Sequence, residues 1–237
     1  MSIAENLQRV HDAIATAASK SGRAFDDVEL IAVTKTHSAE IIREAIEAGQ
    51  TLFGESKLQE ARAKIELLPA SARWHFIGHL QKNKVRHAMA LFEVFHSVDS
   101  LELATAINRI AEEEGHRPHV LLEVNVSGEG SKFGFKPETL REEMETLLAL
   151  DRITIVGLMT IPPFNPEPEA SREFFVALRE LRGELQHEAG AQLPQLSMGM
   201  SGDFAVAIEE GATLVRVGTA IFGERTKWRD RVVVNGD

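Results

Sequence analysis

The sequence predicts an α/β fold in which eight parallel strands close into a (β/α)8 TIM barrel, with an extra helix before the first strand. Short apolar runs alternate with amphipathic stretches along the chain, which is typical of strand-helix-strand units. Eight such runs occur, and eight strands close a barrel. An open doubly wound sheet is the competing architecture. No linker or break in composition divides the 237 residues, so we expect a single domain over residues 1–237.

The elements follow from local patterns. The first 25 residues carry apolar side chains at helical spacing and predict the N-terminal helix. Later segments such as 38–49, 100–115 and 168–190 repeat apolar residues at i, i+3, i+4 and i+7, open on Ser or Pro and close on Gly, as helices do. The Pro-rich stretch 161–170 predicts a loop after the sixth strand. The eight apolar runs that predict strands are residues 28–35, 51–56, 74–79, 94–98, 119–126, 153–160, 194–200 and 213–223, and the last strand is expected to end at Gly218 and Thr219.

The composition of the chain argues against several classes of function. The formal net charge of −10 argues against broad binding to nucleic acid or to anionic membranes, which both require a basic face. The chain has no cysteine, so disulfides and thiolate metal sites are excluded. The N-terminus lacks a signal-peptide core, and no apolar run approaches the roughly 20 residues of a membrane helix. We therefore expect a soluble, cytoplasmic protein.

Lys35 follows the first apolar run, in the stretch LIAVTKTHS. The active site of a TIM barrel lies at the carboxyl ends of its strands, and the period of two places Lys35 on the same side as Ile31 and Val33. It would then point into the barrel mouth as a nucleophilic amine. The alternative is a lysine whose stem packs while its head reaches water.

Strands seven and eight end in residues that suit an anion. Ser201 begins the turn before a helix, where backbone amides and a hydroxyl could bind a phosphate, and Gly218 and Thr219 end the eighth strand. The loops after these two strands form the recurrent phosphate site of TIM barrels. Each motif alone could be an ordinary helix cap or turn. Arg216 interrupts an apolar strand and requires a partner if it is buried.

A lysine, an arginine and a phosphate site together fit pyridoxal 5′-phosphate (PLP), an aldehyde cofactor with a phosphate group. The lysine would form the Schiff base. An arginine at the pyridine nitrogen stays protonated and is a weak proton donor, so the ring would be a poor electron sink. This combination indicates restrained chemistry.

Motifs along the chain resemble the pyridoxal phosphate homeostasis protein family, also called PLP-binding protein. They include AVTKTHS (32–38), WHFIGHLQKNK (74–84), EVNVSGEGSKFGF (123–135), LSMGMSGDF (196–204) and VRVGTAIFGER (215–225). The family is similar to the barrel domain of fold-type III PLP enzymes such as alanine racemase, and the resemblance covers about residues 5–225.

The resemblance implies that Lys35 carries PLP, that Arg216 faces the pyridine nitrogen, and that Ser201, Gly218 and Thr219 hold the phosphate. The family motif Gly-Glu-Asn, whose Asn lies near the cofactor, reads Gly54-Glu55-Ser56 here, so Ser56 takes the place of that Asn. The expected cofactor-binding set is Lys35, Ser56, His79, Met200, Ser201, Arg216, Gly218 and Thr219.

An enzymatic role is the alternative. Racemization by two bases uses the lysine on one side of the substrate and a tyrosine, delivered by a second domain, on the other side. This chain has no tyrosine. His79 could replace it as a base, or could be a hydrogen-bonded loop residue. The spacing of His75 and His79 does not suit a metal pair, and we expect no metal site.

We therefore expect a monomeric PLP carrier in PLP homeostasis, without significant turnover and with PLP-dependent apoenzymes as candidate recipients. A weak amino-acid racemase is one alternative. A barrel aldolase that uses Lys35 on a sugar phosphate is another.

Overall fold

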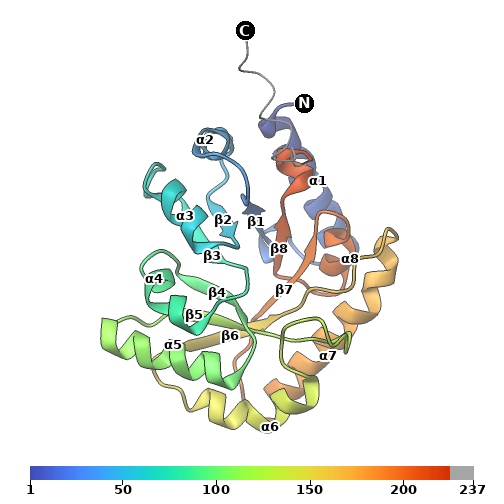
Figure 1. Ribbon diagram of the computed structural model, residues 1–237. Coiled ribbons are helices and arrows are strands. Elements are labelled where there is room, and N and C mark those ends of the chain that lie inside the picture. Colours follow the sequence, from blue (N-terminus) through green and yellow to red (C-terminus); the bar gives the residue numbers. More distant parts are fainter. Residues whose placement is uncertain (225–237) are drawn as a thin grey trace.

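The computed structural model describes residues 1–224, which form a closed barrel of eight parallel strands in sequence order (Figure 1). Each strand pairs with the next, and the last pairs with the first, with Ile31 opposite Arg216. The TIM barrel prediction is confirmed, and the open sheet is excluded. The strands are β1 Glu29–Val33, β2 Leu52–Glu55, β3 Arg73–Phe76, β4 Val94–Val98, β5 His119–Glu123, β6 Thr154–Met159, β7 Gln195–Met200 and β8 Leu214–Val217.

Helices surround the barrel, and the additional N-terminal helix is present. It begins in a capping box, in which the Ser2 hydroxyl accepts from the Glu5 amide and the Glu5 carboxylate accepts from the Ser2 amide. This helix packs against α8 and α9, beside the strands that close the barrel (Figure 1). The α-helices are α1 Ile3–Lys20, α2 Ala39–Glu47, α3 Leu58–Ile65, α4 Val85–Met89, α5 Leu101–Glu114, α6 Pro137–Leu148, α7 Arg172–Glu188, α8 Phe204–Glu209 and α9 Thr219–Phe222.

Several strands are shorter than the apolar runs that predicted them. The run 28–35 contains β1 only to Val33, because pairing with β2 stops where Val33 lies opposite Gly54. The run 213–223 contains β8 and then the short helix α9, which buries Ile221. The strand ends before Gly218, as expected, but the helix after it was not predicted, because an apolar run does not distinguish a strand from a short buried helix.

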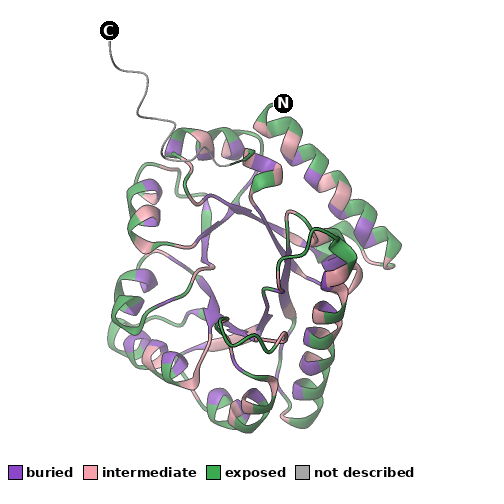
Figure 2. Ribbon diagram, turned by 45° about the vertical axis from the view of Figure 1, so that its right-hand side comes forward, coloured by how far each residue is buried: buried purple, intermediate pink, exposed green. Residues whose placement is uncertain are grey.

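The core has two layers. The larger lies between the sheet and the helices, whose buried sides face the strands while their exposed sides face outward (Figure 2). The smaller layer is a cluster with one residue from each of six strands: Ile31, Leu52, Val94, Leu121, Met159 and Leu214. These alternate along their strands with residues of the outer layer, so they fill the barrel interior.

The inward-facing positions change from apolar to polar toward the carboxyl ends of the strands. Arg216 follows Leu214 by two residues, and Glu123 follows Leu121 by two. The period of two therefore places both charged groups directly above the apolar interior cluster. The barrel presents them to its mouth.

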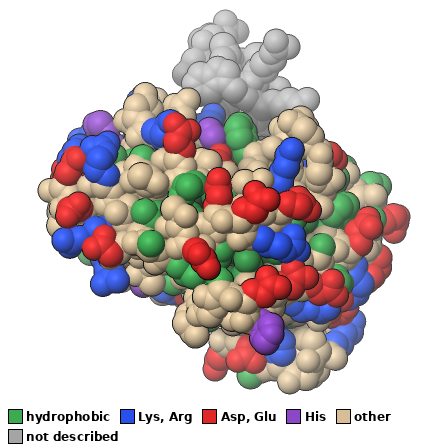
Figure 3. Space-filling view, turned by 90° about the horizontal axis from the view of Figure 1, so that it is seen from below, with side chains coloured by type: hydrophobic (Ala, Val, Ile, Leu, Met, Phe, Trp, Pro, Cys, Tyr) green, Lys and Arg blue, Asp and Glu red, His purple; other side chains and the backbone are tan. Residues whose placement is uncertain are grey.

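On the face shown in Figure 3, acidic and basic side chains are interspersed. None of the helices within residues 1–224 has the length and apolar character required to cross a membrane.

Candidate functional site

A cavity of about 600 Å³ opens at the carboxyl ends of the strands. This volume lies within the range of small-molecule sites. The structure brings all of the predicted cofactor-binding residues into its wall: Lys35, Ser56, His79, Met200, Ser201, Arg216, Gly218 and Thr219.

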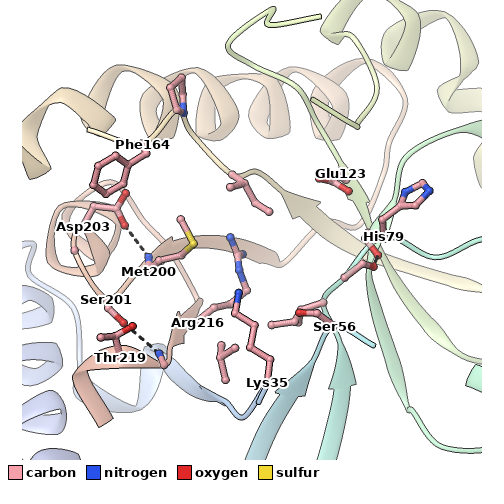
Figure 4. A pocket seen from close by; sticks show the side chains of 18 of the residues that line it. Lys35, Ser56, His79, Glu123, Phe164, Met200, Ser201, Asp203, Arg216 and Thr219 are labelled. Carbon is pink, nitrogen blue, oxygen red and sulfur yellow. Dashed lines mark hydrogen bonds between the residues drawn. The ribbon is translucent and has the colours of Figure 1, made fainter. Parts of the chain in front are cut away.

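Lys35 lies two residues beyond the end of β1, and its side chain points into the cavity toward Arg216 (Figure 4). The residue before Lys35 is still bonded to β2, because the Thr34 amide donates to the Gly54 carbonyl at 3.1 Å. The next residue, Thr36, has a φ of 70°, which is unusual for a β-branched residue. Lys35 therefore sits on a sharp turn at the mouth of the barrel.

Arg216 forms part of the cavity floor and is only 4% exposed. Its guanidinium donates to the Ser197 hydroxyl and to the Thr160 carbonyl, the latter at 2.9 Å. Burial lowers the pKa of Arg216 to about 10, which still leaves it charged at neutral pH. The expectation that a buried arginine requires partners is met by Ser197 on the neighbouring strand β7 and by Thr160, the residue after β6.

A buried chain of polar side chains continues from Arg216 into the barrel. The Ser197 hydroxyl lies 2.9 Å from Nδ1 of His96, and Nε2 of His96 lies 3.0 Å from Nδ1 of His75. Burial lowers the pKa of His75 to about 3 and that of His96 well below its ordinary value. Both imidazoles are therefore neutral at physiological pH, and neither adds a positive charge beside Arg216.

The corner predicted to hold a phosphate is built from β7 and β8. The Ser201 hydroxyl accepts from the amides of Gly218 at 3.2 Å and Ala220 at 3.5 Å, which joins the two loops (Figure 4). Asp203 also lines this corner, but its two oxygens accept from the Met200 amide and the Ser171 hydroxyl. The hydroxyls of Ser201 and Thr219 thus lie together on one side of Lys35.

The opposite side of the cavity carries Ser56 and His79 (Figure 4). His79 pairs with Asp99 at 3.1 Å and stacks on Phe133, with 3.9 Å between the ring centroids. His79 is therefore a loop residue of the cavity wall whose ring lies against Asp99 and Phe133. Within residues 1–224, no hydrogen bond joins the Ser56 hydroxyl to another residue.

Comparison with known proteins places this site in a family. A family model described as "Alanine racemase, N-terminal domain" matches residues 5–226. A protein of Aquifex aeolicus (strain VF5), named pyridoxal phosphate homeostasis protein, is 46% identical over 226 residues, covering 95% of this chain and 99% of its own. The chain belongs to the pyridoxal phosphate homeostasis protein family.

Solved structures agree with this membership. PipY of Synechococcus elongatus PCC7942, determined with PLP bound, is 42% identical with a TM-score of 0.81, and the alignment covers 93% of this chain and all of PipY. Alanine racemase of Clostridium difficile 630 is 18% identical with a TM-score of 0.70, and this chain covers 58% of it. The racemase shares the barrel fold.

Glu123 is a site residue of this homeostasis-family chain that sequence reasoning missed. It lines the cavity at the end of β5 and is 8% exposed, yet no hydrogen bond or ion pair joins its carboxylate to another residue within 1–224. Burial, assisted by Asp99 and opposed by Arg216, raises its pKa to about 7. A charged residue ending an apolar strand was the available signal, as for Arg216.

The rim of the cavity is apolar in this family member. Phe133, Ile161, Phe164 and Met200 all line it, and Phe164 is 95% exposed. Met200 therefore belongs to the cavity wall as predicted, at the exposed end of β7.

Proposed function

We propose that this chain binds PLP in the barrel-mouth cavity, covalently through Lys35, and acts in intracellular PLP homeostasis by storing or delivering the cofactor. The observation that carries the proposal is that Lys35, Arg216 and the Ser201 corner line one cavity. The relative PipY, which covers this chain almost completely, has been solved with PLP bound. The proposal includes a cytoplasmic monomer with one domain over residues 1–237 and PLP-dependent apoenzymes as recipients.

The residues present fit the cofactor. Lys35 supplies an amine for the aldehyde, and condensation of the two releases water. Lys35 and Arg216 bring two cations to a cavity that would receive an anionic phosphate ester. The hydroxyls of Ser201 and Thr219 offer donors of the kind that phosphate oxygens accept. Glu123 offers a carboxyl in the same wall that has no partner among residues 1–224.

The protein residues would bind and orient the group rather than drive reactions on it. PLP supplies an electron sink when its ring nitrogen is protonated. Arg216 keeps its protons at neutral pH, because even its lowered pKa is about 10. With Ser197 and Thr160 already accepting from it, Arg216 has a fixed orientation and offers the ligand a hydrogen bond without giving up a proton.

The decisive experiment is spectroscopic. The purified protein should absorb in the violet-blue range, and borohydride should fix a pyridoxyl group on Lys35, located by mass spectrometry. Lys35→Ala should lose the band and keep the fold, whereas Lys57→Ala, an exposed lysine near the end of β2, should retain it. A label on another lysine would contradict the assignment, and a colourless protein would favour an aldolase.

We further propose that the protein has no significant racemase or transaminase activity. Racemization requires a base on each face of the substrate carbon. The chain has no tyrosine, and His79 is held by Asp99 and Phe133. The holoprotein should therefore give negligible turnover with L- or D-alanine, followed by chirality and by exchange of the α-proton in D₂O. Multiple turnovers at about 1 per second would identify an enzyme instead.

A further inference from the structure

The turn that carries Lys35 needs external support. Among non-glycine residues within 1–224, Thr36 alone has a positive φ, and it directly follows Lys35. Such a conformation persists for a β-branched residue only when the surrounding structure holds it. Neighbouring side chains must therefore stabilise this conformation of Thr36.

The hold comes from a buried cluster formed by β2 and α3. The ammonium of Lys64 donates to the Thr34 carbonyl at 2.8 Å, and pairs with Glu55 at 2.7 Å and Glu60 at 2.6 Å. Glu60 also accepts from the Thr36 amide. The residues immediately before and after Lys35 are therefore both bonded to this cluster.

Glu55 fixes the same segment from the sheet. Its carboxylate accepts from the Thr34 hydroxyl at 2.6 Å, and its second oxygen has no hydrogen-bond partner within residues 1–224. Glu55 is fully buried, and Lys64 is 7% exposed. Burial outweighs the ion pair and raises the pKa of Glu55, so the cluster is not an efficient source of stability. Its hydrogen bonds are directed to the Lys35 turn.

We propose that Lys64, together with Glu60 and Glu55, is a positioning cluster that holds the Lys35 amine in the cavity for covalent binding of an aldehyde ligand. The inference rests on the proposed function, in which Lys35 binds PLP. It assigns a role to Glu55 of the Gly54-Glu55-Ser56 motif and to two residues of α3 outside the cavity wall.

The proposal distinguishes noncovalent binding of the ligand from formation of its covalent bond to Lys35. The Ser201 corner and Arg216 belong to β7 and β8, and β8 pairs with β1 at residues 29–32, before the Lys35 turn. Within residues 1–224 no hydrogen bond of the cluster reaches these two strands, so contacts to a phosphate and a ring should not depend on the turn. Bond formation does depend on it, because small displacements of a reacting group cost large factors in reactivity. Loss of the cluster should weaken covalent binding selectively.

The test compares Glu60 of α3 with Glu66, the residue that caps the end of this helix. Glu60→Ala removes the contact to Thr36 while Lys64 keeps Glu55, and Glu66→Ala is the matched control, since Glu66 forms an exposed i,i+4 pair with Arg62. Two ligands are titrated: PLP, and pyridoxine 5′-phosphate, which has an alcohol in place of the aldehyde. Glu60→Ala should weaken PLP binding about 10-fold or more and slow borohydride trapping on Lys35. The affinity for pyridoxine 5′-phosphate should change less than about twofold, and Glu66→Ala should change neither ligand.

Other outcomes are equally informative. Lys64→Met should reproduce the selective loss; if it does not fold, Glu60→Ala still decides, because Glu60 is partly exposed. Unchanged PLP binding in Glu60→Ala would overturn the inference, as would equal loss of both ligands, which would indicate general support of the cavity. A wild-type protein that forms no covalent link to PLP at Lys35 would instead overturn the proposed function.

Discussion

Replacing Glu123 with Gln should remove a pH-dependent penalty on folding. The carboxyl is 8% exposed and has no hydrogen bond or ion pair to another residue of the described part, 1–224. Its pKa in the folded protein is about 7, raised by burial and by Asp99 from an ordinary 4.5. The folded state therefore holds its proton more tightly than the unfolded chain does. Stability from this group is lost as the pH rises from about 4.5 to 7, and the loss is complete above that range.

The magnitude follows from the two pKa values. Ionising Glu123 costs the folded state about 3 kcal/mol when the pH is well above 7. Between pH 5 and pH 8 the wild-type protein should lose about 2.5 kcal/mol of unfolding free energy that Glu123→Gln keeps. His75, with a folded pKa of about 3, contributes the opposite trend at lower pH, but it is present in both proteins and cancels in the difference.

The assay is urea unfolding of the ligand-free proteins, followed by tryptophan fluorescence at intervals from pH 5 to pH 8. Glu142→Gln on α6, an exposed glutamate, serves as the control and should follow the wild type at every pH. If the difference between Glu123→Gln and the wild type varies by less than about 0.5 kcal/mol over this range, the burial argument for Glu123 is wrong.

Three further substitutions test the cavity floor and the packing of glycines. Arg216→Lys keeps the charge but cannot donate to Ser197, Thr160 and a ligand in the same fork geometry, so PLP binding should weaken about 10-fold in an absorbance titration. An unchanged affinity of Arg216→Lys for PLP would show that the guanidinium does not orient the ligand. Gly157→Ala would place a Cβ 2.0 Å from the Gln195 carbonyl oxygen and should lower the unfolding free energy by about 3 kcal/mol or more. Gly183→Ala in α7, where an added Cβ would meet nothing within 4 Å beyond the backbone of its own helix, should instead raise the unfolding free energy by about 0.5–1 kcal/mol. A fully stable Gly157→Ala would mean that β6 and β7 can separate at little cost.

The barrel could be predicted from the sequence because its signal is local. Each strand is a short apolar run, and the helical segments repeat at their own period, so eight units can be counted without tertiary information. Lys35 and Arg216 were found for the same reason, since a charged residue within or after a buried strand is visible in the sequence. The period of two placed Lys35 toward the barrel mouth, where its side chain lies.

The partners of these residues could not be predicted. Lys64 lies almost thirty residues from Lys35 along the chain, and its bond to Thr34 exists only because α3 folds back over the end of β1. The chain from Arg216 through Ser197 to His96 joins residues of β8, β7 and β4 across the barrel interior. Such contacts depend on strand register and closure.

The sequence alone thus determined that Lys35 faces the barrel mouth, because side-chain direction follows from local backbone geometry. Tertiary structure alone decided which charged residues at the strand ends are paired. Glu123 and Glu55 both end strands, but Glu55 lies on the outer side of the sheet and pairs with Lys64 of α3, whereas Glu123 lines the cavity and has no partner among residues 1–224. The physical reason is that burial and charge pairing are set by neighbours distant in sequence, and these set the pKa of each carboxyl.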